Sequence, residues 1–436
     1  MSKGRLLAGA ATAAASLAAL LAVPGEMRLP AGLIVVCLGL WLTELLPPFA
    51  PTLVLLALAP LLLPGRLPDA QRTVFGWAAD PVLGLFFGGF VLGAAARRHG
   101  IDVRIARWVV RKSAGDARRL TLMLMAGTAT LTMWMSSVAG PAMMLSAAKP
   151  VLAQLDAKGT VRARLLVGIA MAANVAGMST PLSAGPNGIA IAAIESQVRV
   201  TFAGWLTFAF PLVLGLLFIA YVLVLPPADV IMIEPDSSLE PLTRSAKILV
   251  AVVMFAIGLW LAEPLHGVPA SVVSLGLAAL LFSSKLVRSA DLARIDWSTL
   301  LLIAGGILVG RLTENCGLLA LLAGSIDGTS LTPFMARLLI CGAAAFIAAL
   351  MSNTATSALL IPVALQIEPT PSTAILVAVA TSLGAPFVIS TPANAMVAGE
   401  GAQARDILGP GAVLMVVGVV LLAATGPAVL RLWGIP

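Results

Sequence analysis

The sequence predicts an all-α polytopic membrane protein with about eleven transmembrane helices and two re-entrant hairpins, arranged as two inverted repeats. Three observations support this fold class. Of the 436 residues, 59% are hydrophobic and 11% are charged, whereas about a quarter of the residues in a globular domain are charged. The apolar residues form runs of about 20, the length that crosses a bilayer as a helix. Short motifs of the first half recur in the same order in the second half.

The recurring motifs indicate two copies of one unit. The matching segments are 135–138 with 351–354, 39–44 with 258–263, and 88–89 with 305–306. Because an odd number of crossings precedes the second unit in this scheme, the second unit is expected to be inverted in the membrane relative to the first.

The first repeat is expected to cover residues 1–225, including an N-terminal helix. Its first spans are predicted near 5–23, 31–47, 50–65 and 81–96. A helix over 101–112 follows, in which arginines at helical spacing oppose apolar residues. That pattern is typical of a helix that lies in the membrane interface.

A re-entrant hairpin is predicted over 120–148, with Ser136 and Ser137 near its tip. Arg118 and Arg119 precede the segment and Lys149 follows it. Because basic residues favour the cytoplasmic side, both ends are expected there, so the segment enters the membrane and returns.

A broken helix is predicted over 165–197. Two prolines and a glycine interrupt this apolar segment between Met178 and Asn187, and unwound backbone is tolerated within a membrane only where it lines a protein cavity. A further span over about 205–225 completes the repeat.

The second repeat is expected over 246–436, after a polar cytoplasmic linker at 226–245. Its predicted elements are spans at 246–263, 268–284 and 297–313, a short apolar tail at 318–322, a hairpin at 333–367, a broken helix at 373–399 and a last span at 410–432.

The basic residues predict the orientation and the location. In this scheme most of the 27 lysines and arginines lie on one side, which predicts a cytoplasmic N-terminus and a periplasmic C-terminus in a bacterial inner membrane. The net charge of +7 is therefore explained as an orientation signal, and nucleic acid is not an expected partner.

Four helix breaks would converge at the interface of the repeats. Helix N-termini attract anions, while unwound carbonyls and Ser, Thr and Asn oxygens suit sodium. Alternatively, these polar side chains only link packed helices. No Lys or Arg lies at the breaks, so the pattern predicts an anion carrier that uses neutral dipoles and a co-bound cation.

Other functional classes fit less well. An intramembrane enzyme needs a cluster of His and carboxylates or a nucleophile with its base, and the spans contain neither, so an enzyme is not expected. A channel would tolerate broken helices, but inverted repeats with paired hairpins favour alternating access. No cofactor is expected, and Na⁺ is the predicted coupling ion.

These motifs resemble those of the divalent anion/sodium symporter family, which carries C4-dicarboxylates, citrate or sulfate. The resemblance covers nearly the whole chain and is carried by the segments 41–44, 87–90, 352–354 and 390–394. It implies a homodimer with a scaffold domain and a transport domain that moves as an elevator.

The resemblance also implies that Asn353 and Thr354 contact a substrate carboxylate with Thr391 and Pro392 beside it, and that sodium lies near Asn353 and Ser390. Further candidates at the same interruptions are Ser137, Asn187, Ser352 and Asn394 for the substrate, and Ser136, Ser137, Ser183 and Met351 for sodium.

The first half departs from the family pattern. The Asn and Thr expected at the first hairpin tip are Ser137 and Val138, and the expected Thr-Pro-Pro-Asn is the segment 184–187. Two hypotheses follow: the first sodium site is weak or absent, so that the protein uses fewer sodium ions or acts as an exchanger; and the substrate is asymmetric, with a less polar end toward the first hairpin.

Several conspicuous residues have simpler explanations. Glu44 and Glu263 at span ends are expected to be structural, beside tryptophans that anchor at the interface. Asp80 and Asp296 are expected to be helix N-caps. The three cysteines are expected to be buried and free.

Overall fold

The computed structural model describes residues 25–43, 45–47, 49–63, 69–113, 116–156, 159–227, 242–316 and 332–435. The predicted span at 5–23, Glu44, most of the linker at 226–245 and the apolar tail at 318–322 lie outside the described residues. The elements within these ranges are helical, which confirms the predicted all-α class.

The first half begins with a short 3₁₀ helix, η1 (Gly25–Met27). Its α-helices are α2 (Arg28–Thr43), α3 (Ala50–Leu62), α4 (Ala70–Trp77), α5 (Pro81–Arg98), α6 (Ile101–Ser113), α7 (Ala117–Trp134), α8 (Ala139–Leu152), α9 (Thr160–Ala176), α10 (Gly185–Ile194) and α11 (Phe202–Leu223). The sequence analysis did not predict α4.

The second half repeats this order. Its helices are α12 (Arg244–Leu261), α13 (Glu263–His266), α14 (Ala270–Ser283), the 3₁₀ helix η2 (Ser289–Arg294), α15 (Trp297–Asn315), α17 (Pro333–Leu350), α18 (Asn353–Ile367), α19 (Pro371–Thr381), α20 (Pro392–Gly399) and α21 (Ala404–Leu432).

The helices break where small polar residues, glycine and proline interrupt apolar sequence. We call α7–α8 the first hairpin and α17–α18 the second hairpin; their tips are residues 135–138 and 351–352. The first break, residues 177–184, separates α9 from α10, and the second break, residues 382–391, separates α19 from α20. All four interruptions lie where the sequence places them.

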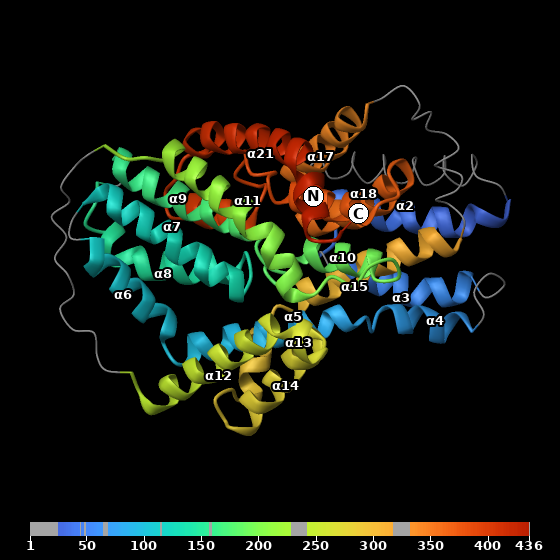
Figure 1. The fold of residues 1–436 in the computed structure, drawn as a ribbon, viewed down its shortest axis with the longest axis horizontal. Helices are drawn as coiled ribbons and strands as arrows, with labels where there is room; N and C mark the ends of the chain where they lie inside the picture. The colour runs from blue at the N-terminus through green and yellow to red at the C-terminus, as the bar shows by residue number, and fades with distance from the viewer. Residues whose placement is uncertain are drawn as a thin grey trace.

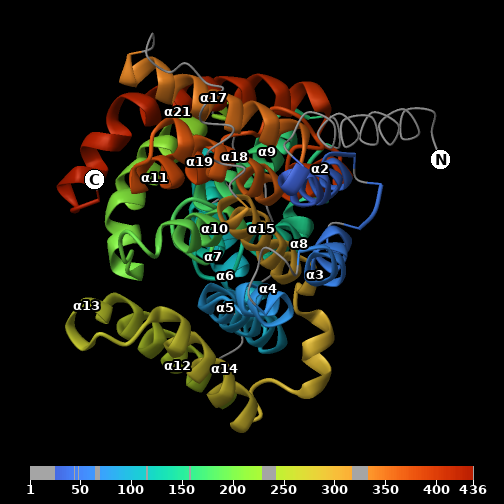
Figure 2. The same cartoon turned by 90° about the vertical axis from the view of Figure 1, so that its right-hand side faces the viewer.

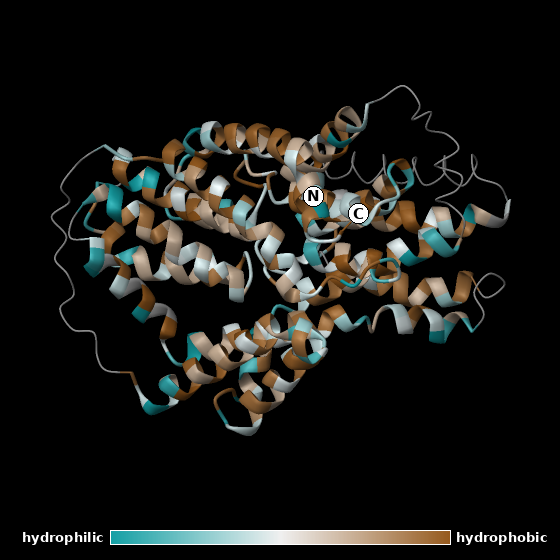
Figure 3. Ribbon diagram, in the orientation of Figure 1, coloured by the Kyte–Doolittle hydropathy of each residue, from teal (hydrophilic) through white to brown (hydrophobic). Residues whose placement is uncertain are grey.

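The two hairpins occupy opposite halves of the molecule. In Figure 1 the first hairpin lies with α9 toward one end of the long axis, and α18 lies with α2 and α3 toward the other. Seen along that axis in Figure 2, α12, α13 and α14 form a separate layer beneath α4 and α5. Hydrophobic residues cover most of the length of the helices, and hydrophilic residues gather toward helix ends (Figure 3).

The number of crossings remains a prediction. By length and composition, five described helices could cross a membrane, or up to six if the bent α4–α5 pair is one span. The five are α11, α12, α15, α17 and α21. Other predicted spans are short or divided: α3 has 13 residues and α14 has 14, which at 1.5 Å per residue gives only about 20 Å each.

Paired glycines bring the two halves together. Gly88 on α5 packs against Ser274 of α14, and Gly305 on α15 packs against Thr52 of α3. The next glycine in each pair faces a broken helix: Gly89 faces Leu182 of the first break, and Gly306 faces α10 and α18. In each pair, the first glycine contacts a neighbouring helix, α14 or α3, and the second contacts the first break or the helices α10 and α18.

The structure tests the simpler explanations. Asp80 accepts a hydrogen bond from the Val82 amide at 2.9 Å, which confirms it as an N-cap. Cys37, Cys316 and Cys341 are buried, as predicted, and form no disulfide with one another. The anchor role proposed for the neighbouring tryptophan is wrong. Trp260 is fully buried, because it stacks on Phe202 at 5.2 Å between ring centres.

Glu263 has the structural role predicted for it. Its carboxylate is buried, lies 3.2 Å from the guanidinium of Arg199 and accepts a hydrogen bond from the amide of Phe202 at 3.0 Å. A buried carboxylate needs such partners.

Candidate functional site

The first break is held open by its own side chains. Asn187 Nδ2 donates to the carbonyls of Gly177 and Thr180 at 2.9 and 2.8 Å. Ser183 Oγ lies 2.8 Å from each of the same two carbonyls and 3.2 Å from the Thr180 amide. These contacts supply partners that the unwound backbone has lost.

The second break repeats the arrangement. Asn394 Nδ2 donates to the carbonyls of Ala385 and Phe387 at 3.0 and 2.8 Å, and Ser390 Oγ accepts from the Phe387 amide at 3.1 Å. Asn187 and Asn394, predicted to bind substrate, thus brace the breaks with their amide N–H groups.

Each hairpin tip is bonded to the break of its own repeat. The Ser137 amide donates to the Ser183 carbonyl at 2.8 Å. Ser390 Oγ donates to the carbonyl of Ala349, at the end of α17, at 2.8 Å. Hairpin and break therefore form one hydrogen-bonded unit in each repeat.

The two repeats meet at the first break. A Cβ on Gly185 would lie 2.6 Å from Thr354 Oγ1, so the N-termini of α10 and α18 are in contact. Because Ser183 holds the first hairpin two residues earlier, both hairpin tips reach the same stretch of unwound chain. Ser137 and Thr354 thus contact positions two residues apart in the chain, Ser183 and Gly185.

A second link between the repeats involves a residue that the sequence analysis missed. Asn174 on α9 donates from Nδ2 to Asn394 Oδ1 at 3.1 Å, and both side chains are buried. Asn174 lies in the middle of a helix, outside the proline and glycine signals that marked the breaks.

The four helix N-termini at the interruptions differ in their caps. Ser136 Oγ accepts from the amides of Val138 and Ala139 at the start of α8, and Thr391 Oγ1 accepts from the Asn394 amide in α20. The N-cap residues of α18 and α10, Ser352 and Ala184, make no side-chain cap. Val138, the N-cap residue of α8, makes no side-chain cap either, but Ser136 bonds the amides at that end. The N-termini of α10 and α18, which touch each other, have no such cap, and the first amides of a helix have no partner within it.

Two acceptors near this junction have no protein partner. Asn187 Oδ1 and Asn353 Oδ1 are buried and make no hydrogen bond. A buried amide oxygen without a partner is costly, and such an oxygen is a suitable ligand for a hard cation. Of the remaining predicted residues, Met351 and Thr391 are buried, and Pro392 begins α20.

A cavity of about 430 Å³, here called the hairpin cavity, lies between α5 and the first hairpin tip. Ser136 and Val138 line it. Its charged lining residues are Arg97, Arg294 and Asp296. No sequence signal placed these arginines beside the hairpin, because α5 and η2 are distant from it in the chain.

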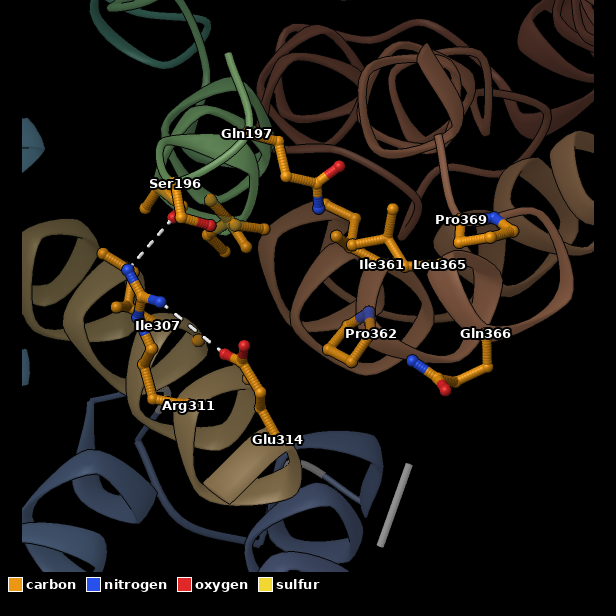
Figure 4. Close-up of a pocket in the computed structure, with 15 residues that line it drawn as sticks. Ser196, Gln197, Ile307, Arg311, Glu314, Ile361, Pro362, Leu365, Gln366 and Pro369 are labelled. Carbon is orange, nitrogen blue, oxygen red and sulfur yellow. Dashed lines mark hydrogen bonds and ion pairs between the residues drawn. The ribbon is translucent and has the colours of Figure 1, made fainter. Parts of the chain in front are cut away.

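A second cavity, of about 220 Å³, lies between α10, α15 and α18 (Figure 4). Arg311 projects into it, with its guanidinium 3.4 Å from the Ala192 carbonyl and 3.6 Å from the Glu314 carboxylate. Gln197 and Gln366 lie at its rim (Figure 4).

Comparison with known proteins identifies relatives of this architecture. The family model described as citrate transporter matches residues 38–379. The chain is 29% identical to an uncharacterized transporter of Haemophilus influenzae, over 89% of this chain and 88% of that protein. It is 24% identical to a sodium-dependent dicarboxylate transporter of Staphylococcus saprophyticus, over 83% and 78%.

Other matches include a transporter of a different anion. An inorganic phosphate transporter of Saccharomyces cerevisiae is 28% identical over 70% of this chain, which spans only 34% of that protein. Among solved structures, the Alcanivorax borkumensis YdaH transporter aligns with a TM-score of 0.56 and 15% identity, over 89% of this chain and 98% of that one. That likeness concerns the fold alone.

Proposed function

The chain belongs to the citrate transporter family, and on that premise we propose that it is a sodium-coupled secondary active transporter of a small anion, with C4-dicarboxylates as the expected class. The resemblance to the divalent anion/sodium symporter family is confirmed, and the chain is a transporter rather than an enzyme. Substrate, coupling ion and mechanism are the proposals developed below.

One observation carries the proposed substrate site: the two N-termini without side-chain caps, those of α10 and α18, lie against each other at Gly185 and Thr354. Each N-terminus carries about half a positive charge and unpaired amides. A carboxylate at this junction would accept hydrogen bonds from α18 and from the Thr354 hydroxyl. Neutral dipoles hold an anion without a buried countercharge, which suits a site that must also release it.

Sodium is proposed to bind beside this anion. Asn353 Oδ1 and Asn187 Oδ1 are buried acceptors without a partner, and the breaks supply further carbonyl oxygens. The sodium-dependent dicarboxylate transporter among the relatives supports sodium as the coupling ion. The first hairpin offers fewer oxygen ligands for sodium, because the Ser136 hydroxyl already accepts hydrogen bonds from two amides of its own tip.

That difference between the hairpins supports an alternative. A carrier with one strong sodium site, or an exchanger that needs no sodium, would also fit a first hairpin that caps itself. Uptake into proteoliposomes with sodium replaced by choline separates the two. Loss of concentrative uptake supports coupling, and undiminished exchange in choline supports the exchanger.

The substrate assignment is tested with one variant and a matched control. We expect Asn353→Ala to abolish uptake and counterflow of succinate. Asn315→Ala removes an amide that is exposed and bonds only to its own helix, and we expect it to transport normally. Citrate, sulfate, phosphate and a monocarboxylate are compared in the same assay. If Asn353→Ala binds succinate with unchanged affinity, the assignment of the substrate site to the α10–α18 junction is wrong.

We further propose an elevator movement in a homodimer, with the N-terminus in the cytoplasm of a bacterial cell. Gly306 supports the sliding contact, because a Cβ there would lie 2.6 Å from Ile189 and 3.1 Å from Ala358. Gly306→Ala is therefore expected to lower kcat more than it raises KM. Equal kcat in variant and wild type would argue against movement at this contact, and light scattering of the purified protein tests the dimer.

A further inference from the structure

A third cavity, of about 240 Å³, lies where α9 and α21 begin. We call it the helix-end cavity. Gly159, the N-cap residue of α9, lines it together with the segment that leads into α21. Its charged lining residues are Arg162 and Arg164 of α9 and Arg405 and Asp406 of α21. Among the described lining residues, three guanidinium groups therefore stand against one carboxylate.

The three arginines occupy positions where a helix disfavours positive charge. Arg162 and Arg164 lie in the first two turns of α9, and Arg405 is the second residue of α21. The start of a helix carries about half a positive charge, so it favours anions and disfavours cations. Gly159 supplies no side-chain cap, so the first amides of α9 have no partner within the helix. The start of α9 thus adds to the positive potential of the arginines.

Hydrogen bonds within the protein do not cancel the charge of these side chains. Arg162 donates to the carbonyls of Leu152 and Glu400, and Arg164 Nη1 donates to the Leu223 carbonyl at 2.6 Å. A carbonyl satisfies an N–H group but carries no net charge. Arg162 Nε is buried without a hydrogen-bond partner in the described structure. Arg405 is exposed and forms no ion pair with a residue that the structure describes.

The carboxylates nearby are too few to balance the arginines. Asp406 accepts from the amide of the N-cap residue of α21 at 2.9 Å. The carboxylate of Glu400 lies 2.9 Å from the ammonium of Lys149, so that pair is neutral. Asp156 precedes the cavity, with its Cβ 3.3 Å from the position of a Cβ on Gly159. Even with Asp156 counted, the three guanidinium groups outnumber the two remaining carboxylates of the described residues.

We propose that the helix-end cavity binds an oxyanion of the phosphate class, held by Arg162, Arg164 and Arg405 and by the first amides of α9. Guanidinium groups donate paired hydrogen bonds to phosphate oxygens and stay charged at physiological pH, and helix N-termini bind phosphate. The tetrahedral oxygens of a phosphate can accept from donors on two helices at once.

This site is separate from the proposed transport site. The helix α9 has 17 residues, so its start lies about 25 Å along the helix from the first break. The first break leads into α10 and the α10–α18 junction. An anion in the helix-end cavity is therefore a ligand of a different part of the protein, and its binding does not depend on which solute is carried.

Two sources present the required chemistry. Basic pockets between membrane helices bind the headgroups of acidic lipids, and the chain belongs to a family of membrane transporters. Inorganic phosphate or a phosphate ester from solution offers the same oxygens. The test below uses one probe for each source.

The test follows thermal unfolding of the purified full-length protein in detergent, with either inorganic phosphate or phosphatidylglycerol added. A ligand that binds only the folded protein raises its unfolding temperature. Phosphatidylcholine and chloride at matched ionic strength are the control additives. The wild type is compared with Arg405→Gln, Arg164→Gln and the double variant. The control variant is Arg72→Gln, since Arg72 also lies in the first turn of a helix, α4, and its side chain is 88% exposed.

Each removed guanidinium should weaken binding of the effective probe about two- to fivefold, as expected for exposed ion pairs, and Arg72→Gln should bind as the wild type does. Stabilisation by phosphatidylglycerol alone supports a lipid headgroup, and stabilisation by phosphate alone supports a soluble ligand. Either result is consistent with the proposed site. Arg405→Gln decides the matter if Arg164 variants do not fold, because the Arg405 side chain is exposed.

Three results would overturn the proposal. The first is that neither probe stabilises the wild type. The second is equal stabilisation of the wild type and the double variant, or of the wild type by phosphatidylglycerol and phosphatidylcholine. The third concerns Asn353→Ala, which alters the proposed transport site and keeps all three arginines. A phosphate effect that is lost in Asn353→Ala and kept in the double variant would place the anion at the α10–α18 junction.

Discussion

Asn394 and Asn187 occupy equivalent places in the two breaks, and their replacement by alanine should have unequal costs. Each side chain donates to two carbonyls of its own break. Asn394 also accepts from Asn174, whereas Asn187 Oδ1 has no partner. Both side chains are fully buried and each variant removes the same atoms, so the two variants differ by one buried hydrogen bond.

The loss in free energy of unfolding is worked out from the polar groups that each variant leaves without a hydrogen-bond partner. Each buried polar group that loses its partner costs about 1–3 kcal/mol. The Ser183 hydroxyl can still donate to one of the two carbonyls that Asn187 bonds, and the Phe387 carbonyl still accepts from the Ser390 amide. Asn187→Ala therefore leaves one carbonyl without a side-chain donor, about 1–3 kcal/mol, and Asn394→Ala leaves the Ala385 carbonyl and the Asn174 amide without partners, about 2–6 kcal/mol. The difference between the variants should be about 1–3 kcal/mol, and Asn394→Ala should be the less stable.

The assay follows unfolding through the three buried cysteine thiols, which react with a thiol dye only after the helices separate. Unfolding in a denaturant series is measured for the wild type, both single variants, Asn174→Ala and the Asn174→Ala/Asn394→Ala pair. The pair should show a coupling energy of about 1 kcal/mol. Equal stability of Asn187→Ala and Asn394→Ala, together with additive effects in the pair, would refute this account of the link between the repeats.

Two further predictions concern Gly185, at the α10–α18 junction, and Asp291 in η2. Gly185→Ala would place a methyl group 2.6 Å from Thr354 Oγ1; we expect an overpacking cost of about 1–3 kcal/mol and reduced succinate uptake, and normal uptake would contradict the contact. The Arg288 amide, and then Arg98, lower the pKa of Asp291 below its ordinary value. Its stabilising effect is therefore complete above that ordinary value, about 3.9, and is lost as the pH falls through the lowered pKa. Asp291→Asn should lower the unfolding temperature at neutral pH and match the wild type in strong acid; a constant difference would contradict this.

Interruptions in apolar sequence predicted much of this fold. Proline and glycine cannot continue a helix without cost, so the segments around 178–187 and 386–394 indicated both breaks from composition alone. The serines at 136–137 and 352 marked the hairpin tips for a similar reason, because their hydroxyls compete for backbone groups.

Contacts between distant parts of the chain were not predictable in this way. Arg97 ends an apolar helix and Arg294 follows a polar turn, and each resembles an ordinary boundary residue until the fold brings both to the first hairpin. The contact of Asn174 with Asn394 was not predictable either, because an asparagine inside a helix of small residues does not indicate which residue it will bond. The number of crossings also remained open, because α3 and α14 are shorter than the runs that suggested them.

Arg162 has a consequence for how the parts can move. Its guanidinium donates to the carbonyl of Leu152, at the end of α8, and to the carbonyl of Glu400, just after α20, the latter at 2.9 Å. One side chain thus fastens the outer arm of a hairpin from one repeat to a half-helix from the other. A shift of α8 that left α20 in place would break one of these two hydrogen bonds, so Arg162 couples the positions of the two helices.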